Sequence, residues 1–329
     1  MTEPVSTPET AQLVRAGGAH LPDALAAVEG LLIEAGGGNG DVLRAHAQAT
    51  IAAGGKRLRP LLLLLVAGEP PDQATAARLQ RAAAAVELIH SATLVHDDVL
   101  DGASLRRGQP TVVALAGREM ATATGDLLFA RAFALLAREE DPLPVRILSE
   151  ACSGLALGEL LQRADAWDPG VSLERYLLRC ELKTARLFEA ACRLGASTEA
   201  PDLAPFGRDI GLAFQMLDDV LDVSGPAERT GKHRGADLLD GTITLPLILA
   251  RERDRDLAAL DPREITTPEQ AEAVCRRIAE TGALEAAREH ALALVAGARA
   301  LLDAHAASLG PGRYEALGLV AESVVRRYS

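Results

Sequence analysis

Asp97, Asp98 and Asp101 have the residue type and the spacing of a metal-binding site. They lie in an otherwise apolar stretch, 86–112, of the chain. If this stretch is helical, successive residues turn by about 100°, so the three carboxylates share one face. Like charges this close raise one another's pKa unless a cation lies between them. The pattern therefore indicates a site for Mg²⁺, which binds through a few carboxylates together with substrate phosphates. The alternative is a solvated acidic helix face.

A second copy of this pattern occurs later in the chain. Asp218, Asp219 and Asp222 repeat the spacing inside another apolar stretch, and Gln215 lies one helical turn before Asp219. A solvated-face explanation would now have to hold twice. Two such triads are expected to face each other across a helical bundle, with metal ions between them holding a phosphorylated substrate.

Basic residues lie at two points where they could bind phosphate. Lys56, Arg57 and Arg59 gather at the expected start of a helix, where the helix dipole and the cations both attract phosphate. Arg106 and Arg107 follow the first acidic triad in a turn, and paired arginines supply the several donors that suit diphosphate oxygens. The alternative is a set of solvated cations at the ends of loops.

Three further candidates carry less information individually. His90 lies seven positions before the first triad, on nearly the same helix face, although a lone histidine is more often a core residue. Lys183, followed by Thr184, is by default a solvated lysine. The basic, glycine-rich loop 231–246 contains Lys232 and would suit a lid over a phosphate, or a plain connection.

The composition favours close-packed helices and argues against nucleic acid as the default partner. Hydrophobic residues make up 48% of the 329 and aromatic residues only 3%, whereas strands favour aromatic and β-branched residues. The net charge is −12, from 34 basic and 46 acidic residues, which disfavours a polyanionic partner. The four cysteines stand far apart without a CxxC pair, which predicts buried thiols in a reducing cytoplasm. No apolar run approaches the roughly 20 residues that cross a bilayer.

Apolar periodicity predicts the helices that hold these residues. Residues 1–20 lack such periodicity and are expected to form a flexible leader, and the rest of the chain is long enough for one large domain or two. Gly158 is expected to allow two helices to approach closely. Helices are predicted over 21–35, from 41, from 60, over 73–101 (as one helix or two), 116–138, 144–164, 173–194, through 214–222, and over 247–259, 268–280, 283–304 and 312–328.

Taken together, these motifs resemble the trans-polyprenyl diphosphate synthases, the family that contains the farnesyl and geranylgeranyl diphosphate synthases. The resemblance covers about residues 21–328, in order and without large gaps. It implies a single all-α domain over residues 21–329, a bundle of roughly ten or more helices around a deep central cavity, usually in a homodimer. The motifs are GGKRLRP at 54–60, ELIHSATLVHDDVLDGASLRRGQPT at 87–111, KT at 183–184, FQMLDDVLDV at 214–223, GKHRGADLLDGTITLP at 231–246 and TGALEAAREHA at 281–291.

The resemblance implies a role for each candidate residue. About two or three Mg²⁺ ions would be held on the allylic diphosphate by Asp97, Asp101 and Asp218, with support from Asp98, Asp219 and Asp222. Isopentenyl diphosphate would be bound by Lys56, Arg59, His90 and Arg107. The allylic diphosphate would be contacted by Arg106, Lys183 and Lys232, with Thr184 and Gln215 nearby, and Arg57 is a weaker assignment.

The reaction expected of such a site needs no protein nucleophile. Diphosphate leaves an allylic carbon when Mg²⁺ and fixed cations neutralise its charge. The double bond of isopentenyl diphosphate attacks the resulting carbocation, and loss of a proton restores an alkene that is one isoprene unit longer. An apolar cavity excludes the water that would quench the cation.

The residues just before the first triad bear on product length. In this family, bulky aromatic residues at these positions form a floor under the growing chain, whereas Ala92 and Thr93 are small. The resemblance therefore implies a long-chain all-trans product. Phe129 or Phe133 on the next helix could still close the tunnel, so a geranylgeranyl diphosphate synthase is the alternative.

One position departs from the family pattern, and two rival functions remain. Many members have a lysine where this chain has Thr242, so one diphosphate-facing cation is missing, although Lys232 remains. A class I terpene cyclase would usually replace the second acidic triad by a motif that mixes Asn, Ser or Thr, and Glu. A catalytically silent subunit of a two-component synthase would usually lose acids or basic residues that are present here.

Overall fold

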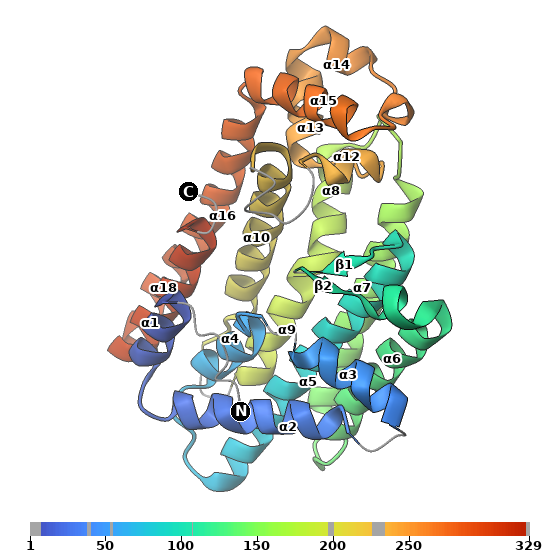
Figure 1. The fold of residues 1–329 in the computed structure, drawn as a ribbon. Coiled ribbons are helices and arrows are strands. Elements are labelled where there is room, and N and C mark those ends of the chain that lie inside the picture. The colour runs from blue at the N-terminus through green and yellow to red at the C-terminus, as the bar shows by residue number, and fades with distance from the viewer. Residues whose placement is uncertain are drawn as a thin grey trace. The chain divides into compact units, whose positions relative to one another are not determined.

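The computed structural model describes residues 8–37, 41–52, 55–106, 108–196, 201–225 and 234–326, except for the side chains of residues 8, 9, 41 and 42. Two predicted site residues, Arg107 and Lys232, lie outside this part of the chain. Helices make up most of the described structure (Figure 1), which confirms the all-α prediction. Within the same residues, the one sheet is a two-stranded antiparallel ribbon.

The chain divides into two compact units, each assembled from three stretches of sequence. Unit 1 comprises Met1–Cys152, Leu187–Ala204 and Leu302–Val320, and unit 2 comprises Ser153–Arg186, Pro205–Leu301 and Ala321–Ser329. The first acidic triad belongs to unit 1 and the second to unit 2. The single domain over 21–329 stays a prediction.

Unit 1 contains the helices of the N-terminal half together with all or part of several later helices. Its elements are α1 (Pro8–Gly17), α2 (Leu21–Ala35), α3 (Asp41–Ala52), α4 (Leu58–Ala67), α5 (Gln73–Asp101), β1 (Leu105–Arg106), β2 (Gln109–Pro110), α6 (Val112–Leu136), the start of α7 (Leu143–Ala164), α9 (Arg186–Gly195), the end of α16 (Ala283–Ala304), α17 (Ala306–Leu309) and most of α18 (Pro311–Arg326).

The core of unit 1 forms around α5, which is packed against α2, α4 and α6. Four consecutive alanines, 82–85, are buried in α5, and their small side chains let neighbouring helices approach closely. The leucine run 61–65 of α4 is buried as well. A helix that is apolar on all sides belongs in the interior, and burial of these side chains supplies the main stabilising free energy.

Unit 2 contains the remaining helices. Its elements are the rest of α7, α8 (Leu173–Cys180), the π-helical turn η1 (Glu181–Ala185), α10 (Ala204–Ser224), α12 (Ala236–Leu239), α13 (Leu245–Arg253), α14 (Arg255–Ala259), the 3₁₀ turn η2 (Pro262–Glu264), α15 (Pro268–Glu280) and most of α16.

Most predicted helices are present with bounds within a few residues, and several segments differ, among them 236–239, which form α12 inside the predicted loop 231–246. Residues 8–17 form α1 where a flexible leader is expected, with a proline and an acid in its first turn and Arg15 in its last, which suits a helix. Helix α6 begins at Val112 and is kinked at Gly117, whose φ is 84°. The predicted helix 173–194 is interrupted by η1. The predicted helix 247–259 is two helices.

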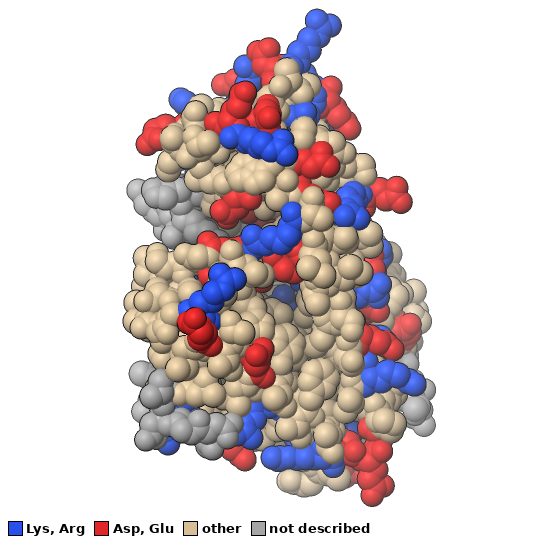
Figure 2. Space-filling view, turned by 90° about the vertical axis from the view of Figure 1, so that its right-hand side faces the viewer, with Lys and Arg blue, Asp and Glu red and all other residues tan. Residues whose placement is uncertain are grey.

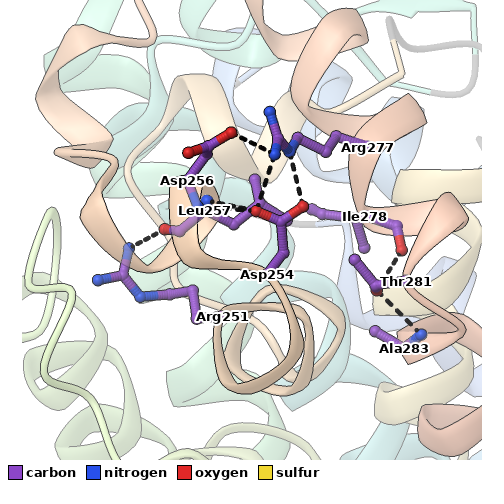
Figure 3. Close-up of polar contacts among 8 residues, drawn as sticks. All are labelled: Arg251, Asp254, Asp256, Leu257, Arg277, Ile278, Thr281 and Ala283. Atoms are coloured by element: carbon purple, nitrogen blue, oxygen red, sulfur yellow. Dashed lines mark hydrogen bonds and ion pairs between the residues drawn. The ribbon is translucent and has the colours of Figure 1, made fainter.

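The break between α13 and α14 is fixed by polar contacts (Figure 3). Asp254 is extended, with φ −130° and ψ 120°, and its carboxylate accepts hydrogen bonds from the N–H groups of Asp256 and Leu257, at 2.8 and 3.0 Å. The guanidinium of Arg277 on α15 bonds the same carboxylate and lowers the pKa of Asp254. Arg251 donates to the carbonyls of Leu257, Ala258 and Leu260, which closes the end of α14. Asp254 is therefore both the C-cap of α13 and the N-cap of α14.

Charges of both signs lie interspersed over the face drawn in Figure 2, among neutral residues. The net charge of −12 is thus not gathered into one acidic area of that face. Within the described part of the chain, no helix has the length and apolar character needed to cross a membrane.

Candidate functional site

The first acidic triad lies in the last turn of α5, in unit 1. Asp98 is 5% exposed, Asp97 is half-buried and Asp101 is exposed. The helix ends at Gly102, whose φ of 62° gives the left-handed cap that usually requires glycine. Carboxylates at a helix C-terminus lie at the negative end of the dipole, so a nearby cation stabilises them.

Arg106 supplies one such cation. Its Nε lies 2.8 Å from Oδ1 of Asp98, and its Nη2 also lies 2.8 Å from that oxygen. The β1–β2 ribbon, in which Arg106 pairs with Gln109, turns the chain back toward α5 and so places this guanidinium. The buried carboxylate is therefore held by the fold, whereas the other two acids of the triad reach solvent.

Helix α6 approaches α5 closely beside this triad. The ring of His96 occupies the space that a Cβ at Gly125 would need, and it stacks on Phe129 with the ring centroids 5.7 Å apart. Nε2 of His96 lies 3.4 Å from Oδ1 of Asp126. The absence of a side chain at Gly125 thus lets the His96 ring of α5 lie against α6, and Phe129 contacts the same ring.

The three basic residues at the start of α4 have different surroundings. Lys56 is exposed, and the guanidinium of Arg59 lies 4.4 Å from the ring centroid of Phe188. The guanidinium of Arg57 bonds the carboxylates of Glu29 at 2.7 Å and Glu87 at 2.9 Å. Burial raises the pKa of Glu87, although Arg57 acts in the opposite direction. Arg57 is therefore held by two acids of the protein itself, Glu29 and Glu87, which agrees with its weaker assignment to substrate binding.

Of the other unit 1 candidates, His90 is half-buried on α5. Ala92 is 0% exposed, and the hydroxyl of Thr93 donates to the carbonyl of His90 at 2.8 Å. Phe133 is half-buried on α6.

The second triad lies near the end of α10, in unit 2. Asp218 is exposed, Asp219 is 4% exposed and Asp222 is half-buried. Oδ2 of Asp222 accepts a hydrogen bond of 3.2 Å from the N–H of Asp237, and its carbonyl accepts one of 2.9 Å from Gly235. The backbone at Gly235 and Asp237 is therefore hydrogen-bonded to Asp222, the last acid of the second triad.

Asp219 is the centre of a buried hydrogen-bond network. The hydroxyl of Tyr176 donates to Oδ2 at 2.6 Å, and the amide of Gln215 donates to Oδ1 at 2.8 Å. The hydroxyl of Thr184 in turn donates to the amide oxygen of Gln215 at 2.7 Å. Burial, followed by repulsion from Asp237, raises the pKa of Asp219 to about 8 despite these donors.

Lys183 is held in η1 by two residues of α7. Its Nζ lies 2.6 Å from Oε2 of Glu159 and 3.2 Å from Oε1 of Gln162. Burial acts to raise the pKa of Glu159, but Lys183 and Arg163 outweigh it and hold that pKa below its ordinary value. A π turn is typical of functional positions in helices. Here it lets two consecutive residues, Lys183 and Thr184, contact different helices.

Gly158 has the predicted role of allowing close approach. A Cβ at this position would lie 2.6 Å from the backbone nitrogen of Lys183 and 3.0 Å from its Cα. Both are backbone atoms of η1, which cannot rotate away as a flexible side chain would. Helix α7 therefore packs on the π turn through its backbone.

We expect Gly158→Ala to destabilise the protein. Alanine should gain about 1 kcal/mol of helix propensity but cost about 1–3 kcal/mol in overpacking against η1. Gly30→Ala in α2 is the matched control, because nothing lies within 4 Å of the added Cβ there. Chemical denaturation should show a lower free energy of unfolding for Gly158→Ala and an equal or higher one for Gly30→Ala. Equal gains in both variants would contradict the close contact.

The segment before α13 is anchored on Trp167. The N–H of Trp167 donates to the carbonyl of Gly241 at 2.8 Å, and the indole fills the space that a Cβ at Gly241 would need. Gly241 has a φ of 72°, a second reason for glycine. Thr242, which replaces the family's usual lysine, donates its N–H to the carbonyl of Asp237 at 2.8 Å.

Several residues of this arrangement have no signal in the sequence. Tyr176, Glu159 and Gln162 look like ordinary helix residues, and their roles depend on contacts between helices. Among the described side chains, no group of three or more His, Cys, Asp or Glu is arranged to hold a metal ion. In each triad one buried aspartate accepts hydrogen bonds from protein side chains: Asp98 from Arg106, and Asp219 from Tyr176 and Gln215. The metal and diphosphate roles of the site residues stay predictions.

The chain is similar to known prenyltransferases in sequence and in structure. Residues 41–280 match the family model described as Polyprenyl synthetase. A heptaprenyl diphosphate synthase component 2 from Geobacillus stearothermophilus is 41% identical over 281 residues, 83% of this chain and 86% of that protein. A prenyl transferase from Synechocystis is 39% identical over 255 residues, 75% of this chain and 79% of that protein.

A solved structure from Caulobacter crescentus extends the similarity to the full length. This polyprenyl synthase, complexed with calcium and isoprenyl diphosphate, superposes with a TM-score of 0.87 at 34% sequence identity, and the match covers 100% of both chains.

Proposed function

Because the chain belongs to the polyprenyl synthetase family, we propose that it extends an allylic diphosphate by condensation with isopentenyl diphosphate. The observation that carries this proposal is the matching arrangement of the two triads. Each has one buried aspartate fixed by protein donors, Asp98 or Asp219, beside an exposed acid, Asp101 or Asp218. Such an arrangement suits recognition of a charged, phosphorylated ligand.

The residues present fit Mg²⁺. All the ligands proposed are carboxylate oxygens, the donor type that this ion prefers. Near Asp219 the negative charges of Asp237 and Asp218 add to burial in raising its pKa, so a cation there would be stabilised. We assign about two or three ions to Asp97, Asp101 and Asp218, supported by Asp98, Asp219 and Asp222. When bound, Mg²⁺ supplies neutralisation of the diphosphate as the allylic bond ionises.

The chain's own side chains bind the two diphosphates and exclude water from the carbocation. Arg106, Lys183 and Lys232 contact the leaving diphosphate, with Thr184 and Gln215 nearby, and fix its orientation. The other diphosphate, that of isopentenyl diphosphate, is held by Lys56, Arg59, His90 and Arg107. Buried leucine and alanine side chains supply apolar surroundings that keep water from the carbocation.

We propose a long-chain product. Relatives include solanesyl diphosphate synthases from rice and Arabidopsis and the heptaprenyl enzyme named above, although a geranylgeranyl diphosphate synthase from Methanosarcina mazei is 38% identical. The small side chains of Ala92 and Thr93 support the longer product. A twenty-carbon product is the second candidate, which the Methanosarcina relative favours.

The test is incubation of the purified protein with Mg²⁺, isopentenyl diphosphate and farnesyl diphosphate, followed by sizing of the dephosphorylated products. We expect a ladder that ends beyond twenty carbons. A ladder that stops at twenty refutes the long-chain proposal. Absence of elongation with any allylic primer refutes the activity of the isolated chain. Activity that returns only with a second subunit would identify a two-component synthase, which the Geobacillus relative's name makes the first alternative to test.

Ala92→Phe should shorten the product. A phenylalanine here would place a ring where the growing chain is proposed to pass, and Ala92→Leu, with a smaller side chain, should shorten it less. Because Ala92 is fully buried, both variants must first be shown to retain helicity and cooperative melting. Product lengths are then compared by chromatography. A folded Ala92→Phe variant with an unchanged product would place the floor elsewhere, with Phe129 and Phe133 as the next candidates.

We also propose a homodimer in the cytoplasm. None of the four cysteines forms a disulfide in the described structure, and three of them are buried, which suits a reducing compartment. Analytical ultracentrifugation of the purified protein tests the dimer.

A further inference from the structure

Tyr176 is buried at a position where a phenylalanine would fill the same space. Its side chain is 0% exposed, and its hydroxyl donates to Oδ2 of Asp219. A buried hydroxyl is costly unless it is hydrogen-bonded, so the contact at 2.6 Å accounts for a tyrosine at this place. Tyr176 lies in α8, 43 positions before its partner.

The ring of Tyr176 is itself held in place. The guanidinium of Arg179, which is 3% exposed, lies 5.6 Å from the ring centroid. Arg179 donates to the carbonyl of Ile243 and lies 3.8 Å from the carboxylate of Asp165. These contacts come from the segments before α8 and before α13, so the phenol has a fixed platform within unit 2.

The two oxygens of Asp219 are bonded from two directions. Tyr176 bonds Oδ2 from α8, and Gln215 bonds Oδ1 from within α10, with Thr184 holding the Gln215 amide. Two donors on opposite oxygens fix the rotation of the carboxylate about its last side-chain bond. Each oxygen has two lone-pair positions, and each accepts one of these two bonds, so the donors set the direction in which the second position of each oxygen points.

We propose that Tyr176 is a positioning residue for the second acidic triad, whose hydroxyl orients Asp219 and thereby strengthens cation binding there. This inference rests on the proposed function, since it deepens the role assigned to the triad. Partners that orient ligands of a metal typically contribute about 10–100-fold in metal affinity. Tyr176 touches neither the metal nor the substrate and acts only through Asp219.

The test is a titration of the full-length protein with Mn²⁺ in the presence of inorganic pyrophosphate, in which electron paramagnetic resonance measures free Mn²⁺. We expect Tyr176→Phe to weaken Mn²⁺ binding by about 10–100-fold. The matched control is Tyr314→Phe, which removes another tyrosine–aspartate hydrogen bond, 2.6 Å to Asp303, in unit 1. Its Mn²⁺ affinity should equal that of the unmodified protein.

An unchanged Mn²⁺ affinity in a folded Tyr176→Phe variant overturns the inference. If that variant does not fold, Thr184→Val tests the same carboxylate from its other oxygen, because it releases Gln215. It is expected to weaken Mn²⁺ binding in the same direction, and an unchanged affinity overturns the inference equally. The elongation assay is a separate readout. If the unmodified protein does not elongate an allylic diphosphate, the proposed function is refuted. The titration would still show whether Tyr176 contributes to Mn²⁺ affinity.

Steady-state kinetics separates positioning from a purely structural role. Tyr176→Phe should raise the Mg²⁺ concentration needed for half-maximal rate, and saturating Mg²⁺ should restore much of kcat. A variant that only lost stability would show the unmodified Mg²⁺ dependence in its folded fraction, which would count against the inference.

Discussion

Replacement of Asp218 by alanine should lower kcat by a factor on the order of 10² to 10³ or more. Asp218 is the exposed acid of the second triad, beside the buried Asp219, and is assigned to Mg²⁺ on the allylic diphosphate. Its loss would remove a proposed Mg²⁺ ligand, and Mg²⁺ is needed most as the leaving diphosphate gains negative charge. Binding of the second substrate should change little, so the effect should appear in kcat and in the Mg²⁺ dependence. Asp97→Ala should behave in the same way.

Asp256→Ala is the control for this experiment. Asp256 is an exposed acid in the same unit, and its ion pair with Arg277 lies at the start of α14 (Figure 3). An exposed pair contributes little to stability, so this variant should keep both its fold and its rate. A near-normal kcat for Asp218→Ala, alongside a normal control, would remove Asp218 from the metal site.

The second large effect concerns stability. Arg57→Met should lower the free energy of unfolding by about 3–5 kcal/mol, the usual range for removing one partner of a buried ion pair. The side chains of Arg57 and Glu87 are 14% and 6% exposed, so the carboxylate that remains is not solvated. Burial already raises the pKa of Glu87, and without Arg57 this carboxyl should take up a proton more readily.

Urea denaturation measures this difference, and two further variants interpret it. Arg57→Met combined with Glu87→Gln should recover part of the loss, because the more deeply buried of the two acids that Arg57 bonds is then neutral, whereas Glu29, 27% exposed, still loses its partner. Arg326→Met removes an exposed pair with Glu322, whose side chains are 55% and 40% exposed, and should cost less than about 1 kcal/mol. A loss no larger for Arg57→Met than for Arg326→Met would show that Glu87 finds another partner.

The sequence predicts most helices, and the grouping of each acidic triad on one helix, because both depend on residues that are close together in the chain. The helix over 73–101 and the triads within single helical turns follow from periodicity that a short window contains. Local signals also exist for α1, in its first-turn proline and its last-turn Arg15, although apolar periodicity alone misses it. The division of α13 from α14 depends on the capping side chain of Asp254, which periodicity does not report.

The partners of the site residues are not local, and this is why the sequence does not predict them. Tyr176 reaches Asp219 across 43 positions, and Lys183 reaches Glu159 across 24. Arg57 is one of three neighbouring cations in the sequence, and nothing in that sequence indicates that its guanidinium pairs with Glu29 and Glu87. A left-handed backbone at Arg57, with φ 46°, turns it away from the direction that a regular helix start would give.

The way the two compact units share the chain limits how such proteins can be recombined. Because each unit is built from three separate stretches, no single crossover point exchanges one unit and leaves the other intact. A chimera that took residues up to 152 from one relative would still build unit 1 partly from the other parent's residues 187–204 and 302–320. Chimeras of relatives should therefore be functional most often when all three stretches of a unit are inherited together.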